Sequence, residues 1–147
     1  MIRPRPGWLV TLFAAVIVLS GWLPWLATTA NGGGHASAIG GTFGSIVIPA
    51  RFGAGQLIVL LASTLAVAGA MTARGLSPRL SALAALVVSL LIGLLTVSYY
   101  RLNVHPPVAA AYGLYIGAAG AVGAVVCSVW AVASAYTAPR VVARAAR

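Results

Sequence analysis

The amino-acid sequence predicts an all-α membrane protein, a four-transmembrane-helix bundle with a long glycine-rich loop on its outer side. Of its 147 residues 61% are hydrophobic and only 6% are charged, whereas soluble domains have about 25% charged residues. Four apolar runs are each long enough to cross a bilayer, which takes about 20 helical residues. Most of the arginines lie in segments that a four-span chain places on one side of the membrane. We therefore expect a single integral membrane domain over residues 1–147.

The centre of this prediction is the short turn at residues 74–79, between two apolar runs without a charge. We expect the runs at 56–73 and 80–100 to form the second and third spans. Loops that carry arginine resist translocation, so a short turn with an arginine at each end indicates the cytoplasmic side.

The residues of this turn also suit the end of one helix and the start of another. Gly75 is typical of the left-handed residue that follows a helix C-terminus, where Arg74 would interact favourably with the helix dipole. Ser77 is a good N-cap and Pro78 a good first helical residue.

The first apolar run, at about residues 8–27, predicts the first span. Trp8 lies at its inner end and Trp22 and Trp25 at its outer end, which indicates aromatic belts at both interfaces. Pro24 is expected to loosen the last turn. A cleavable signal peptide is the alternative interpretation, but the run is long for the apolar part of one.

The segment at residues 28–55 predicts a long outer loop rich in glycine. Within it the β-branched stretch Ser45–Ile48 is followed by Pro49, and we expect it to form a short strand or hairpin edge. The apolar patches of the loop favour an ordered structure that packs on the helix ends or on another subunit.

The fourth span is expected at residues 108–136, after a short outer turn at 101–107, and a basic tail follows at 138–147. If the tail forms a helical turn, its three arginines share one face and bind anionic lipid at the membrane surface. These residues are Arg140, Arg144 and Arg147.

The distribution of charge predicts the topology. The nine arginines give a net charge of +9, and there is no Asp, Glu or Lys. Four spans with both termini in the cytoplasm place seven arginines inside and only Arg51 and Arg101 outside, as the positive-inside rule requires. All basic residues other than histidine are arginine, and Ala, Gly, Val and Pro are abundant, which is typical of a GC-rich genome; the expected location is the inner membrane of a bacterium.

The missing residue types exclude several functions. No Asp, Glu, Lys, Arg or His falls within an expected span, so proton-coupled export, oxygen-rich cation sites and intramembrane haem ligation lack their side chains. Catalysis by carboxylates is impossible, and a Ser–His pair would lack its orienting acid. The arginines are scattered and form no basic face on a soluble fold, which argues against nucleic acid. The sequence predicts no enzyme and no cofactor.

Two histidines and one cysteine are the residues with ligand chemistry. His35 and His105 both fall in outer loops and would hold Zn or Cu only with ligands from a partner; two unrelated loop histidines are the simpler interpretation. Cys127 lies deep in the fourth span and is expected to be a packing residue.

Small residues recur at helical spacing in three of the expected spans. Such stripes let helices approach closely in lipid, and they serve either the packing of this bundle or the docking of another protein. Span two has Ala62, Ala66 and Ala70. The residues expected to pack helices or contact a partner in spans three and four are Ala85, Ser89, Gly93, Gly113, Gly117, Gly120 and Ala121.

The two outer arginines, Arg51 and Arg101, have no carboxylate side chain anywhere in the chain to pair with. A guanidinium is always charged and requires acceptors. We therefore expect these side chains to contact water and lipid phosphate, or the acidic residues of a partner.

Three stretches resemble a group of small actinobacterial membrane proteins. They are residues 21–25 (Gly-Trp-Leu-Pro-Trp), 51–56 (Arg-Phe-Gly-Ala-Gly-Gln) and 112–117 (Tyr-Gly-Leu-Tyr-Ile-Gly). Together they resemble the tryptophan-associated transmembrane proteins and, within these, the LucB-type accessory subunits of mycobacterial Mce lipid importers. The resemblance implies a complex of permease chains, an ATPase and a periplasmic Mce tube, and it carries over no catalytic residue.

The resulting hypothesis is a non-catalytic accessory subunit that docks on the permease of an Mce-type ABC lipid importer and stabilises or regulates it. Its partners would be membrane lipids and other integral membrane proteins. Two alternatives remain open: a supernumerary subunit of a respiratory complex, and a stand-alone small transporter or lipid-binding membrane protein.

Overall fold

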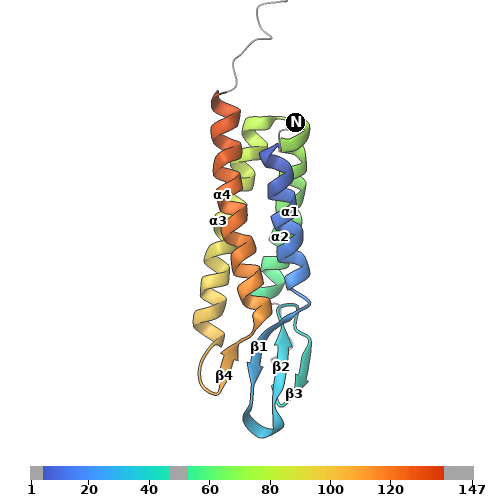
Figure 1. The fold of residues 1–147 in the computed structure, drawn as a ribbon, viewed down its shortest axis with the longest axis vertical. Helices are drawn as coiled ribbons and strands as arrows, with labels where there is room; N and C mark the ends of the chain where they lie inside the picture. Colours follow the sequence, from blue (N-terminus) through green and yellow to red (C-terminus); the bar gives the residue numbers. More distant parts are fainter. Residues whose placement is uncertain (1–4, 47–52, 138–147) are drawn as a thin grey trace, which may run out of the picture.

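A computed structural model describes residues 5–46 and 53–137, in which a helical bundle carries a small β-sheet at one end (Figure 1). The helices are α1 (Pro6–Ser20), α2 (Ala54–Arg74), α3 (Pro78–Asn103) and α4 (Tyr112–Thr137). The strands are β1 (Pro24–Thr28), β2 (Gly34–Ser37), β3 (Thr42–Gly44) and β4 (Val108–Ala110). A 3₁₀ turn, Ala30–Gly32, joins β1 to β2.

The four helices form a ring in which each packs against two neighbours: α1 against α2 and α4, and α3 against α2 and α4. Among the described residues three helices, α2, α3 and α4, are long and apolar enough to cross a membrane. The remaining helix, α1, is apolar but has only 15 residues, a length of about 22 Å at 1.5 Å per residue. This arrangement fits a helical membrane protein.

The turn between α2 and α3 has most of the expected features. Gly75 adopts the left-handed conformation (φ 75°), and the amide of Leu76 donates to the carbonyl of Met71, which closes the end of α2. Pro78 is the first residue of α3, as expected. The prediction for Ser77 is wrong in one respect: it is itself left-handed and its hydroxyl makes no capping hydrogen bond.

The expected first span is wrong over its last third. Helix α1 ends at Ser20, and residues 24–28 are strand β1 instead of the last helical turns. The amide of Leu23 donates to the carbonyl of Ser20, so the chain leaves the helix through a tighter turn. Pro24 explains the change, because a proline biases the preceding residue away from helix and cannot donate in the helical ladder.

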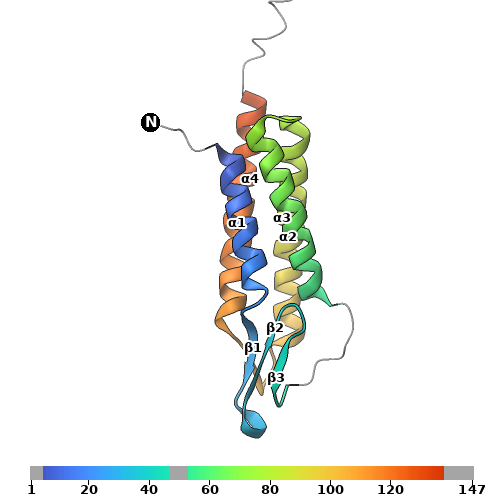
Figure 2. The ribbon, with the colours of Figure 1, turned by 90° about the vertical axis from the view of Figure 1, so that its right-hand side faces the viewer.

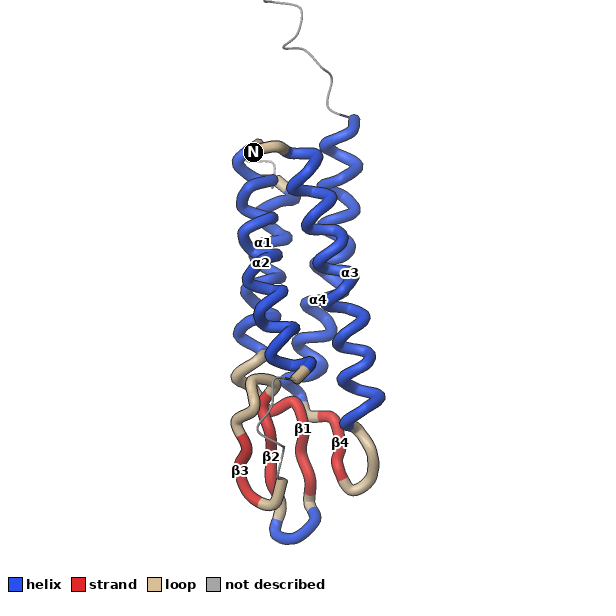
Figure 3. Tube along the Cα trace, turned by 180° about the vertical axis from the view of Figure 1, so that it is seen from behind, coloured by secondary structure: helices blue, strands red, loops and turns tan. Residues whose placement is uncertain are grey.

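The sheet is formed by two connections at this end of the molecule: β1, β2 and β3 lie between α1 and α2, and β4 lies between α3 and α4. It is antiparallel, with the order β3-β2-β1-β4, and β1 pairs with both β2 and β4, so that Ala27 lies between His35 and Ala109 (Figure 3). The short strand expected at Ser45–Ile48 is wrong in position, since Ser45 and Ile46 follow the end of β3. Val47 and Ile48 lie outside the described residues.

Two further boundaries differ from the sequence prediction. Helix α3 continues to Asn103, where the Asn103 side chain donates to the carbonyl of Tyr99, so Arg101 is in the last turn of a helix and not in a loop. Residues 108–110 form β4, and α4 begins only at Tyr112. Hydropathy did not separate β4 from α4, because the residues of the strand are as apolar as those of the helix.

Trp25 joins the sheet to the bundle. Its ring is completely buried and meets the ring of Tyr99 edge-on at 5.1 Å, and its indole nitrogen donates to the carbonyl of Ser20 at 2.7 Å. The prediction that Trp25 belongs to an interfacial belt is therefore wrong. Figure 2 shows β1 leaving α1 directly below the bundle.

Candidate functional site

The glycines expected on the fourth span face the same chain. A Cβ atom on Gly117 would lie 2.8 Å from the Trp25 ring and 2.9 Å from the Ser20 hydroxyl, and one on Gly113 would lie 2.6 Å from the carbonyl of Pro24. Gly120 packs in the same way on Ile17, and Ala121 is buried beside it. The three glycines close the contact of α4 with α1 and β1, so this side of α4 presents no free face to another protein, whereas Ala121 lines a space toward α3.

The small residues of α3 divide into two groups. Ala85 and Ser89 are buried inside the bundle, and the Ser89 hydroxyl donates to the carbonyl of Leu86 at 2.9 Å. Gly93 differs, because a Cβ atom built on it meets nothing within 4 Å. The space beside Gly93 is part of a groove.

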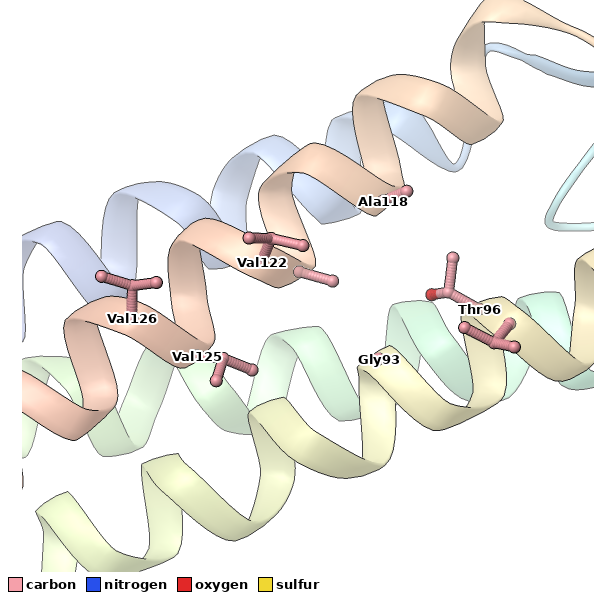
Figure 4. Close-up of a pocket in the computed structure, with 8 residues that line it drawn as sticks. Gly93, Thr96, Ala118, Val122, Val125 and Val126 are labelled. Atoms are coloured by element: carbon pink, nitrogen blue, oxygen red, sulfur yellow. The ribbon is translucent and has the colours of Figure 1, made fainter.

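The groove runs between α3 and α4 and has a volume of about 320 Å³. Its floor is made by Thr96 and Ala121, which are buried, and Val97, Val122 and Val126 on its rim are exposed. In Figure 4 Thr96 and Ala118 lie at the end nearer to the sheet, and Val126 lies at the far end. The remaining lining residues are Gly93, Ala118 and Val125.

The groove offers no polar group to a ligand. Its one polar side chain is that of Thr96, whose hydroxyl donates to the carbonyl of Ile92 at 2.8 Å within its own helix. A water molecule requires two or more polar partners, so an apolar occupant suits this space.

Arginines mark both ends of the bundle. At the end away from the sheet, Arg5 donates to the carbonyl of Ala73 at 3.1 Å, and Arg79 donates to that of Ala135 at 3.4 Å. Both arginines belong to the N-terminal ends of α1 and α3, and their side chains contact the C-terminal turns of α2 and α4, where the helix dipole favours positive charge. Arg101 is exposed at the sheet end. The other arginines of the prediction, Arg51, Arg140, Arg144 and Arg147, lie outside the described residues.

Exposed aromatic side chains also lie at both ends of the helices, as in proteins with interfacial belts. At the sheet end they are Trp22, Tyr100, Tyr112 and Tyr115. At the opposite end they are Trp8, Trp130 and Tyr136.

The sheet carries an exposed aromatic pair. Phe43 on β3 is 68% exposed and stacks on His35 of β2, with the ring centres 5.2 Å apart. The two residues are direct cross-strand neighbours. Sequence analysis did not single out Phe43, because a lone phenylalanine in a glycine-rich loop does not reveal its register in a sheet.

The residues with ligand chemistry do not form a cluster. His105 is exposed in the turn before β4, where its ring contacts the carbonyl of Val104, and His35 lies on β2. Cys127 is buried in α4. Within residues 5–46 and 53–137 no group of three His, Cys, Asp or Glu side chains could hold a metal ion.

Comparison of the chain with family models, with curated proteins and with solved structures finds no match.

Proposed function

We propose that this chain is a non-catalytic accessory subunit of a larger membrane complex and that it docks through its sheet. The observation that carries the proposal is the Phe43–His35 pair, a stacked and exposed surface on adjacent strands. Aromatic residues dominate the energetics of protein interfaces because they bury a large area at a small entropic cost.

The sheet can act as a rigid docking element because the bundle fixes it. Trp25 of β1 is held by Ser20 and Tyr99, and β4 leads directly into α4. A surface that is already ordered loses little conformational entropy when it binds.

For the identity of the complex we propose an Mce-type ABC lipid importer, with the chain docked on its permease and stabilising or regulating it. The support is the resemblance of residues 21–25, 51–56 and 112–117 to the LucB-type accessory subunits. In this proposal the membrane is the bacterial inner membrane and the sheet lies outside the cytoplasm. Arg5, Arg74 and Arg79 support this orientation, since all three lie at the end away from the sheet.

A pull-down of the tagged full chain from its own host in mild detergent, read by mass spectrometry, tests the proposal. We expect permease and Mce chains with the wild type and several-fold less of them with Phe43→Ser. Thr42→Ala is the matched control, because Thr42 is an exposed neighbour on the same strand. Oxidase chains would identify a respiratory complex instead, and a chain that purifies alone would indicate a stand-alone protein.

Reporter fusions test the orientation separately. A reporter inserted at Gly33, in the turn between β1 and β2, and one after Arg147 should report opposite sides of the membrane. Signals from the same side would contradict a topology with four crossings.

A further inference from the structure

We propose that the groove between α3 and α4 binds one acyl chain of an anionic phospholipid, whose phosphate is held by Arg101. The inference does not depend on the proposed function, because the groove and Arg101 belong to the chain itself. It assigns a ligand to Arg101 and a role to Gly93.

The groove fits hydrocarbon. Its floor is buried and apolar apart from the Thr96 hydroxyl, which is already engaged within its helix, and its rim consists of valines. Gly93 keeps the groove open, because a side chain at this position would enter it (Figure 4). The groove faces the surface that the helices present to lipid, so a chain can enter from the bilayer.

The length of the groove favours an acyl chain over a partner helix. From Ala118 to Val126 the groove follows nine residues of α4, a rise of about 12 Å at 1.5 Å per step. A transmembrane helix would pack along most of a hydrocarbon layer about 30 Å thick. A short apolar groove suits part of a flexible hydrocarbon chain.

Arg101 lies on the continuation of the groove toward the sheet. Gly93, Val97 and Arg101 are spaced by four residues on α3, so they lie on one face of that helix. On α4, Tyr115 is three residues before Ala118 on the groove face and is exposed. Arg101 and Tyr115 therefore follow the groove residues along their own helices toward the sheet, at the level of the aromatic belt.

Any anion that binds Arg101 at this end must come from outside the chain. The chain contains no Asp or Glu, so no carboxylate side chain of its own can neutralise Arg101. A guanidinium binds phosphate oxygens with two parallel hydrogen bonds, and Tyr115 can donate a further one. A phospholipid supplies the phosphate and the acyl chain together, at the depths where Arg101 and the groove lie.

The test uses the purified full chain in mild detergent with added phosphatidylglycerol or phosphatidylcholine, and native mass spectrometry counts the lipids retained. We expect the wild type to retain several-fold more phosphatidylglycerol than phosphatidylcholine. Arg101→Gln should lower this preference. Arg74→Gln should keep it, because Arg74 is an exposed arginine in the last turn of a helix at the opposite end.

A second pair of variants tests the groove. Gly93→Leu should fill it and lower the retention of both lipids, and the open space around Gly93 leads us to expect a folded protein, which circular dichroism checks. Ala84→Leu adds the same side chain at an exposed position of α3 outside the groove lining and should retain lipid as the wild type does.

Three results would overturn the inference. Equal lipid preference in Arg101→Gln and Arg74→Gln would exclude Arg101 as the phosphate site. Unchanged retention in folded Gly93→Leu would exclude the groove. If Gly93→Leu keeps its lipid but loses partner chains in the pull-down, the groove holds a helix. A loss of partners in Phe43→Ser alone bears only on docking through the sheet.

Discussion

Helix α4 meets its two neighbours in different ways. Toward α1 and β1 it presents glycines, and the side chains of Trp25, Ile17 and Phe13 fill the space that these glycines leave. Toward α3 it presents alanine and valine, and a groove remains beside Gly93. We refer to these as the closed seam (α1–α4) and the open seam (α3–α4).

The comparison shows that a small residue has two opposite uses in a membrane bundle. In the closed seam the absence of a side chain lets a large partner approach, and the dispersion contacts of that partner stabilise the fold. In the open seam no residue within 5–46 and 53–137 takes the space, and we propose that a lipid chain does. Substitutions should therefore destabilise the fold in one seam and affect binding in the other.

The largest effect is expected from Trp25→Ala, which empties the closed seam. The substitution removes a completely buried ring and its hydrogen bond to Ser20, and truncations of this kind cost about 3–5 kcal/mol. Thermal unfolding in detergent measures the loss. Trp22→Ala is the control, because Trp22 is 61% exposed and should change stability by less than about 0.5 kcal/mol. Equal losses would contradict a special role for Trp25.

Gly117→Leu should force the closed seam apart. Even a Cβ atom at this position would lie 2.8 Å from the Trp25 ring, and overpacking of this kind costs about 1–3 kcal/mol or more. The isolated variant should melt at a lower temperature or elute as aggregate. If it were stable alone but failed to retain partner chains, the stripe would be a docking surface after all.

Arg79→Gln tests how the open seam is held at the end away from the sheet. The Arg79 guanidinium lies over the Tyr136 ring at 5.3 Å and donates to the carbonyl of Ala135, so it links α3 to α4. Its loss should cost about 0.5–1 kcal/mol, as expected for a cation–π contact near the surface. The melting temperature measures this change, with Arg74→Gln as a control that should be near wild type. No difference between the two would mean that Arg79 does not hold the seam.

The smallest effect on stability is expected from Gly93→Leu in the open seam. The space is empty of protein, so the free energy of unfolding should change by less than about 0.5 kcal/mol. Comparison with Gly117→Leu gives the contrast between the two seams with the same substitution. A loss as large as that of Gly117→Leu would show that the open seam closes in solution.

The sequence alone determined the membrane-type helical class and the turn where α2 ends and α3 begins, because local rules govern both. A bilayer sets the length of an apolar helix, and Gly75 and Pro78 punctuate the chain through their own backbone preferences. The same rules failed at residues 24–28 and 108–110, where short apolar strands read as parts of helices.

Only the tertiary structure decided that Trp25 is buried, where Phe43 lies in the sheet, and which glycines contact another segment of the chain. Trp22 and Trp25 are three residues apart in one apolar run, yet one is exposed and the other is completely buried. Hydropathy measures only the free energy of moving a side chain out of water. It therefore does not distinguish a side chain that faces lipid from one that is buried in the protein interior. Only the packing of α1, β1 and α4 distinguishes the two environments. For the same reason, the four-residue spacing predicted that α3 and α4 each have a face of small residues, but it did not predict which of these faces another helix covers.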